Sequence, residues 1–290
     1  MQVWDIDDLS VVVGVYKLAK RVGFKLPPRR GPKGYDIAVK IAVTAFVILL
    51  GKSYLKSLKA LEKTKLLQIL GLRRAPSPAS ITRWKRSLEL YARALIRQSF
   101  LMLARRRHHP LLGVIDGSGL KLTKASEHYL RRIGKKAPFL LITTLYAPEI
   151  DAIYDLVATP NCNSENMAFW NYLFKVIIYS GVFWGIIMDK RYDDAKITEW
   201  LESYGIVTFI PARGGKLEPV DGPRLRADMR YTLLLSIKNY RSLIESSFSS
   251  MKTFKNYIKS KLTRTNEYDV LIMALAYNTA RLIKKGEIKA

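Results

Sequence analysis

Two short apolar runs, each followed by an aspartate, constrain the fold of this chain more than any other feature of its sequence. Leu111–Ile115 precedes Asp116, and Phe183–Met188 precedes Asp189. Runs of this length and composition are typical of strands that are buried on both faces of a parallel sheet. Because the carboxyl ends of parallel strands meet at one edge of a sheet, we expect the two aspartates to approach each other there.

A third acidic residue lies in a predicted amphipathic helix over residues 239–257. Apolar residues recur there at helical spacing and define one face: Leu243, Ile244, Met251, Phe254 and Ile258. At about 100° per residue, Arg241, Glu245 and Lys252 fall within roughly 40° of one another on a different face. That face presents a base, an acid and a base.

These residue types suit a divalent-metal site that acts on phosphodiesters. Mg²⁺ prefers hard oxygen ligands and usually takes one or two carboxylates from the protein besides substrate phosphate oxygens. Asp116, Asp189 and Glu245 are therefore the candidate catalytic and metal-ligating residues, and three carboxylates suit two Mg²⁺ or Mn²⁺ ions. Arg241 and Lys252 are candidates for binding the flanking phosphates. The alternative is three unrelated acids, two at strand ends and one in a charged helix.

At these residues the chain resembles the DDE transposases of bacterial and archaeal insertion sequences, in the branch with a Tyr-x2-Arg-x3-Glu-x6-Lys helix signature. Arg241, Glu245 and Lys252 match the spacing of the last three residues of that signature, and a different residue occupies the tyrosine position. The segments 114–118 and 189–193 look like the first and second acidic motifs of the family.

The resemblance implies an α/β fold with an RNase H-like catalytic domain, in which a mixed five-stranded sheet is flanked by helices, preceded by an all-helical N-terminal DNA-binding domain. The apolar pattern predicts the same order of elements: strands at 111–115, 139–146, 152–159, 185–188 and 207–211, a helix at 164–179, and a helix after Asp193. The resemblance also implies a metal-dependent DNA transposase. Such an enzyme hydrolyses phosphodiesters at the ends of its element and transfers the 3′-hydroxyl into target DNA, as a homodimer or larger assembly on DNA.

The predicted domains are a helical DNA-binding region at 1–108 and the catalytic domain at 109–290, which includes a basic loop at 212–230 and a C-terminal helix. Asp193 and Asp194 are expected to cap the helix that follows them. Further candidate DNA-binding residues are Arg83, Lys85 and Arg86 in the helical region, Lys190 after the second aspartate, and Arg213, Lys216, Arg224 and Arg226 in the loop. The alternatives are a solvated helix face for the first group and a disordered surface insertion for the loop.

The charge of the chain independently favours a nucleic-acid partner. Its 49 Lys and Arg against 24 Asp and Glu give a formal net charge of +25. Such an excess favours binding to a polyanion, although a generally basic protein without chemistry would show it too. Cys162 is the only cysteine, which excludes a disulfide framework within one chain and favours a reducing compartment, here the cytoplasm. The longest apolar stretch, residues 41–50, is too short to cross a membrane.

Two other functions share much of this pattern. A catalytically inactive descendant would keep the DNA-binding surface and serve as a DNA-binding or regulatory protein. A host nuclease of RNase H-like fold would use the same metal chemistry without strand transfer.

Overall fold

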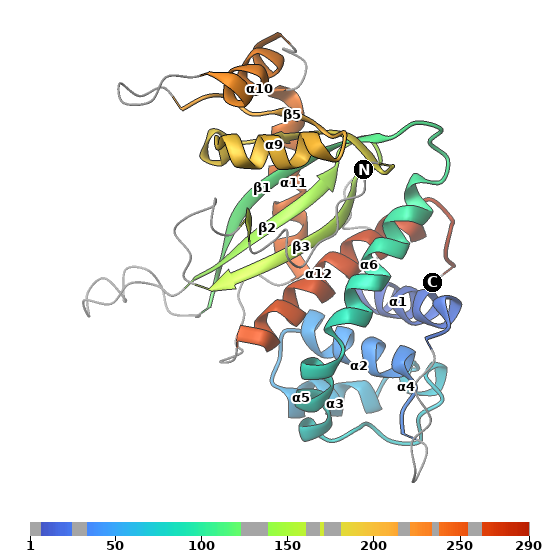
Figure 1. Cartoon of the computed structure of the whole chain (residues 1–290). Helices are drawn as coiled ribbons and strands as arrows, with labels where there is room; N and C mark the ends of the chain where they lie inside the picture. The colour runs from blue at the N-terminus through green and yellow to red at the C-terminus, as the bar shows by residue number, and fades with distance from the viewer. Residues whose placement is uncertain are drawn as a thin grey trace, which may run out of the picture. The chain divides into compact units, whose positions relative to one another are not determined.

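The structure of the chain is a computed structural model that describes residues 7–24, 34–122, 139–160, 169–170, 181–213, 221–233, 238–254 and 263–289 (Figure 1). The chain forms two compact units. Unit 1 comprises Met1–Leu103 together with Ser250–Ala290, and unit 2 comprises Ala104–Ser249. The first boundary lies close to the predicted one, whereas the C-terminal segment groups with the N-terminal helices instead of the sheet.

Unit 2 is built on a mixed five-stranded sheet with the strand order β3-β2-β1-β4-β5. Its strands are β1 (Leu111–Lys121), β2 (Phe139–Ala147), β3 (Ala152–Pro160), β4 (Phe183–Met188) and β5 (Val207–Phe209). The first three strands pair antiparallel, and β1 pairs parallel with β4, as β4 does with β5. This order and these directions are consistent with the predicted RNase H-like fold. The predicted helix at 164–179 lies outside the described residues except for Phe169 and Trp170.

Two glycines let the central strands of unit 2 pack closely against their neighbours. A Cβ atom on Gly113 of β1 would lie 2.8 Å from the Leu145 side chain, and one on Gly185 of β4 would lie 2.8 Å from the Phe209 ring. Real Cβ atoms essentially never approach so closely, so side chains at these positions would displace the core. Glycine in the two central strands therefore reflects packing.

Among the described residues of unit 2, the sheet is accompanied by α9 (Ala195–Ser203), α10 (Gly222–Leu233) and the part of α11 (Lys238–Phe254) that precedes Ser250. Helix α9 begins at its N-cap Asp194, whose side chain accepts a hydrogen bond from the Lys196 backbone N–H at 2.9 Å. Helix α10 packs against α9 and β5.

The prediction of a basic loop over 212–230 is wrong for its second half, because residues 222–233 form α10. Gly222 and Pro223 mark the first turn of this helix, where proline is tolerated because its missing N–H has no helical partner. Two of the residues that suggested a loop, Gly222 and Pro223, therefore stand where a helix begins.

The described part of unit 1 is all-helical and contains α1 (Asp8–Val22), α2 (Ile37–Leu49), α3 (Tyr54–Glu62), α4 (Leu66–Ile69), α5 (Pro78–Ser87), α6 (Glu89–Ala104), the last residues of α11 and the C-terminal α12 (Thr263–Lys284). Only the last residue of α6 lies beyond the unit boundary. Helix α12 packs against α1, α2 and α5. Every residue from 265 to 280 is buried, so α12 is the central helix of this unit. It acts as a packing element.

The polar residues of α12 are bonded to the N-terminal helices. Lys85 Nζ of α5 lies 2.5 Å from the Asp269 carboxylate, and Arg93 of α6 donates to Glu267 at 2.6 Å. Two polar contacts are neutral: Thr44 Oγ1 lies 2.7 Å from the Tyr268 hydroxyl, and Asn278 donates to Ser99 Oγ at 3.0 Å. Buried charges need such partners, which explains why α12 belongs to unit 1.

Among the described helices, no single one is long and apolar enough to cross a membrane. The pair α2 and α3 meets the length and composition required of a span only when the two are counted together, across a bend of 114°.

Candidate active site

Asp116 and Asp189 lie at corresponding positions on two adjacent parallel strands. The parallel ladder between β1 and β4 ends with Ile115 paired to Met188, and each aspartate is the next residue along its strand direction. Both side chains are partly exposed. The two aspartates therefore follow paired residues of neighbouring parallel strands. The predicted end of the first strand at Ile115 is wrong, however, because β1 continues to Lys121 and Asp116 pairs with Thr144 of β2.

Each of the two carboxylates makes the same local hydrogen bond. Asp116 Oδ1 accepts the backbone N–H of Gly117 at 2.8 Å, and Asp189 Oδ1 accepts the backbone N–H of Lys190 at 2.7 Å. Asp189 thereby caps a short 3-10 turn, η2 (Lys190–Tyr192). A hydrogen bond of this kind restricts the side-chain torsions, so one carboxylate is held in a defined position within β1 and the other just after β4.

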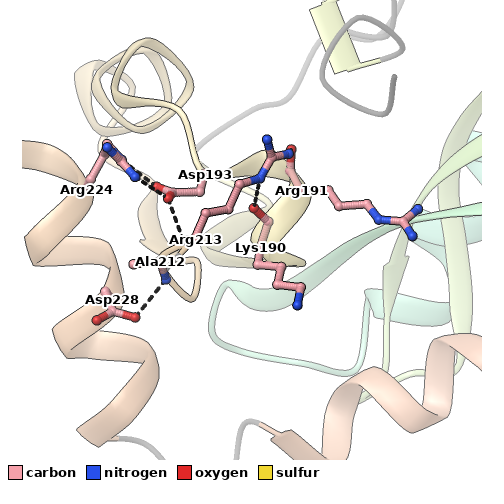
Figure 2. Close-up of polar contacts among 7 residues, drawn as sticks. All are labelled: Lys190, Arg191, Asp193, Ala212, Arg213, Arg224 and Asp228. Atoms are coloured by element: carbon pink, nitrogen blue, oxygen red, sulfur yellow. Dashed lines mark hydrogen bonds and ion pairs between the residues drawn. The ribbon is translucent and has the colours of Figure 1, made fainter. Parts of the chain in front are cut away.

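The turn after Asp189 is stabilised by hydrogen bonds from Arg213, which follows β5. The Arg213 side chain donates from Nε to the carbonyl oxygen of Lys190 at 2.8 Å and from Nη2 to that of Arg191 (Figure 2). Its backbone N–H donates to Asp193 Oδ2 at 2.8 Å. One arginine therefore ties the end of β5 to the backbone that carries Asp189.

Asp193, at the end of this turn, also stabilises it. Its carboxylate accepts hydrogen bonds from Arg224 of α10 as well as from Arg213. Arg224 donates to the Asp193 carboxylate through Nε at 2.9 Å and Nη2 at 2.6 Å, and the Asp193 side chain is only 3% exposed (Figure 2). Burial raises the pKa of Asp193, but the hydrogen bonds from Arg224 and Arg213 outweigh burial and hold this pKa below its ordinary value. Asp193 thus stays ionised and links η2 to α10.

Two further ion pairs hold α10 on α9. Arg226 and Arg230 donate to the two carboxylate oxygens of Glu202 at 2.8 and 2.6 Å. Burial raises the pKa of Glu202, and the two arginines together lower it below its ordinary value. Arg224, Arg226 and Arg230 of α10 are therefore all bonded to acidic residues of their own unit.

Three of the predicted DNA-binding residues are bonded within unit 2. The guanidinium groups of Arg213, Arg224 and Arg226, which the sequence placed in a basic loop, donate to groups of η2, Asp193 and Glu202. Their assignment to DNA stays a prediction. Lys216 lies outside the described residues. Lys190 differs from the arginines because its side chain is exposed directly beside Asp189.

Lys85, another predicted DNA-binding residue, is buried. It lies in the last turn of α5 with a side chain that is 1% exposed, paired with Asp269 and donating to the Tyr54 hydroxyl at 3.1 Å. Burial lowers the pKa of Lys85, but the Asp269 carboxylate and Tyr54 outweigh burial and raise it. Lys85 is thus a structural cation, whereas Arg83 and Arg86 are exposed, which suits both DNA contact and a solvated helix face.

Glu245 lies on an exposed face of α11, and Ile244, Phe248 and Met251 are buried. Arg241 lies one turn earlier in the same helix. Lys252 is part of unit 1, and burial lowers its pKa.

Within the residues that the structure describes, no group of three His, Cys, Asp or Glu residues is placed to hold a metal ion. Glu245 therefore does not complete a three-carboxylate site with Asp116 and Asp189 in this conformation. The donor set that does fit Mg²⁺ or Mn²⁺ is the pair of partly exposed carboxylates of Asp116 and Asp189, since such ions commonly take one or two protein carboxylates.

No protein-family model matches the chain, and no curated protein matches it. Among solved structures, a chain of the "Crystal structure of a pre-cleavage Mos1 transpososome" is similar over 93% of this chain and 85% of that chain, with 10% sequence identity and a TM-score of 0.21. A similarity this weak carries no argument about fold or function, so both rest on the residues and the sheet described above.

Proposed function

We propose that the protein is a divalent-metal-dependent DNA transposase. The observation that carries the proposal is the parallel pairing of β1 with β4, which ends one residue before Asp116 and Asp189. Two carboxylates that follow paired residues of neighbouring parallel strands suit a hard cation that also binds phosphate oxygens. The net charge of +25 supports a polyanionic substrate, and the resemblance around Glu245 supports DNA strand transfer.

In this proposal each group of the chain has a separate role. Asp116 and Asp189 would hold Mg²⁺ or Mn²⁺, which supplies Lewis-acid stabilisation of the phosphoryl oxygens and lowers the pKa of bound water. Lys190 and Arg241 would bind phosphates on either side of the scissile bond. Glu245 would supply the third carboxylate once substrate and cations offset the mutual repulsion of the acids.

The test is cleavage of a labelled duplex that carries the DNA flanking the gene, with Mg²⁺, with Mn²⁺ or with chelator. Wild type should cut at the element end only when metal is present, and Asp116→Asn and Asp189→Asn should abolish cutting. Glu199→Gln, which removes an exposed carboxylate on α9, is the matched control and should cut normally. Cutting by Asp189→Asn at the wild-type rate would refute the assignment. Joining of the cut end to a second duplex separates a transposase from a nuclease.

A DNA-binding protein without cleavage is the second candidate function. It is favoured by one observation, the lack of an assembled three-acid group within the described parts of the chain. Metal-independent binding with no cutting under any of the three conditions would support this candidate over the transposase.

A further inference from the structure

We infer that unit 1 binds the phosphodiester backbone of DNA in an open hollow formed by Tyr35 and the loop Gly71–Arg74. The hollow has a volume of about 450 Å³ and is lined by Gly34, Tyr35, Gly71, Leu72, Arg73 and Arg74. The choice of DNA as the ligand rests on the proposed function. This locus is separate from the predicted contacts at Arg83 and Arg86.

The loop that carries the two arginines is fixed at both ends. Helix α4 ends in a Schellman motif, in which Gly71 N–H donates to Gln68 O at 2.9 Å and Leu72 N–H to Leu67 O at 3.0 Å. Gly71 has a φ of +66°, a left-handed conformation that glycine adopts without strain. On the other side of the arginines, the Ala75 N–H donates to the Glu62 carboxylate at 3.4 Å. The loop is thus ordered before any ligand binds, which lowers the entropy cost of binding.

The side chains of Arg73 and Arg74 are exposed, and within the described residues neither guanidinium has a hydrogen bond or an ion pair. This contrasts with Lys85 and Arg93 of the same unit, which are buried and paired with acids. Exposed, adjacent guanidinium groups match the geometry of phosphate oxygens and can each donate two hydrogen bonds to one phosphate.

The hollow is also lined by the Tyr35 ring and by two glycines, Gly34 and Gly71. Tyr35 packs edge-on against Trp84 of α5, with ring centroids 5.2 Å apart and an interplanar angle of 71°. A Cβ atom added to Gly34 or Gly71 would meet no atom within 4 Å, so the ligand can approach the backbone here. Phosphate and sugar contacts from arginine, tyrosine and backbone amides position a protein on DNA without reading its sequence.

The inference is tested with the full-length protein and a fluorescent duplex in chelator, so that binding is measured without cleavage. Arg73→Ala with Arg74→Ala should weaken binding about tenfold and reduce the slope of log K against log salt by about 1.8, or roughly 0.9 for each phosphate that the variant no longer binds. Lys52→Ala with Lys56→Ala is the charge-matched control. Both lysines are exposed in unit 1 and neither lines the hollow. Equal thermal unfolding of the two double variants shows that folding is unchanged.

Affinity and slope equal to those of the control pair would overturn the inference. The same arginine dependence on duplex RNA, with none on DNA, would overturn it as well. These outcomes are independent of catalysis: a wild type that binds without cutting contradicts the proposed function and leaves the hollow intact. A wild type that cuts, but whose binding does not depend on Arg73 and Arg74, contradicts only the hollow.

Discussion

At the scale of single residues, Lys85 shows that a charged residue predicted to contact DNA can instead be part of the core. It follows Arg83 and precedes Arg86, yet it lies on the side of α5 that also carries Ile81, Trp84 and Leu88. Positions separated by three, four and seven residues share one helix face, so the periodicity itself places Lys85 among apolar residues. Its partner Asp269 is 184 residues away in the sequence, which no local pattern reveals.

Replacing Lys85 by Met should lower the free energy of unfolding of unit 1 by about 3–5 kcal/mol, because Asp269 is left buried without a counterion. Lys85→Met combined with Asp269→Leu should recover most of that loss. Urea denaturation measures both, with the exposed Arg86→Met as a control expected to change stability by about 0.5 kcal/mol or less. A loss no larger than that of the control would contradict the role of the ion pair.

The raised pKa of Lys85 determines how the stabilisation by the Lys85–Asp269 pair depends on pH. A cation whose pKa is raised by folding stabilises the protein fully below its ordinary value of 10.5, and this contribution is lost as the pH rises through the raised pKa. The stabilisation by this pair is therefore constant from neutral pH to about pH 10.

At the scale of elements, the order of the strands was predictable because each strand has a strong local signal. The apolar runs before Asp116 and Asp189 predict two buried strands, and the structure pairs them in parallel. Helix α10 lacks such a signal. Its hydrophobic residues Leu225, Met229 and Leu233 are exposed, and the helix is held on unit 2 by arginines that bond to Asp193 and Glu202.

Ion pairs of this kind depend on partners from other elements, so the sequence showed the arginines without showing where they bond. Asp193 was expected to cap α9 because it stands before that helix. Asp194 fills the N-cap position, which leaves the Asp193 carboxylate for Arg213 and Arg224. A helix has one N-cap residue, so the second acid in such a pair is a candidate for a tertiary contact.

Acid should weaken the ion pairs that hold α10 on the rest of unit 2. The pKa values of Asp193 and Glu202 are both held below their ordinary values of 3.8 and 4.5. Their contribution to stability is therefore present above about pH 4.5 and is lost as the pH falls through the lowered values. The free energy of unfolding, measured by urea denaturation between neutral pH and pH 3, should fall on acidification in wild type.

The variant Asp193→Asn with Glu202→Gln should show a flatter pH profile than wild type, at lower stability near neutral pH. Glu199→Gln on α9 is the single-acid control and should follow the wild-type profile. Parallel profiles for wild type and the double variant would show that these carboxylates do not hold α10.

At the scale of the whole molecule, the chain returns to its first unit at the C-terminus. Helix α12 supplies Glu267, Asp269 and Asn278 to the N-terminal helices, and its sequence resembles a routine amphipathic packing helix. Which unit it completes depends on contacts across more than 170 residues, so local periodicity predicted the helix and not its neighbours.

Removal of residues 263–290 should therefore unfold unit 1, although the deletion lies at the other end of the chain. Lys85 and Arg93 would be left as buried cations without counterions, and the apolar surface around α12 would be exposed. Far-UV circular dichroism should show a loss of helix larger than that of the deleted segment, and a synthetic peptide of residues 263–290 should restore it. A loss that equals only the deleted helix would contradict the central position of α12.

Because of its net charge, the protein should respond to added salt in opposite ways: its melting temperature should rise and its affinity for DNA should fall. With 25 more positive than negative side chains, the folded state repels itself, and added salt screens that repulsion. The melting temperature should therefore rise between about 0.05 M and about 0.5 M NaCl. The pairs Lys85–Asp269 and Arg93–Glu267 are buried and are screened far less, so they do not reverse the trend.

The affinity for DNA should fall over the same range of salt. Binding to each phosphate releases counterions, and their release is less favourable when the salt concentration in solution is higher. About six to ten phosphate contacts correspond to a fall of roughly a thousandfold or more. Thermal unfolding and fluorescence anisotropy on the same protein samples measure the two responses. A melting temperature that falls with salt would mean that exposed ion pairs, such as those of Glu202, outweigh the repulsion among the excess cations.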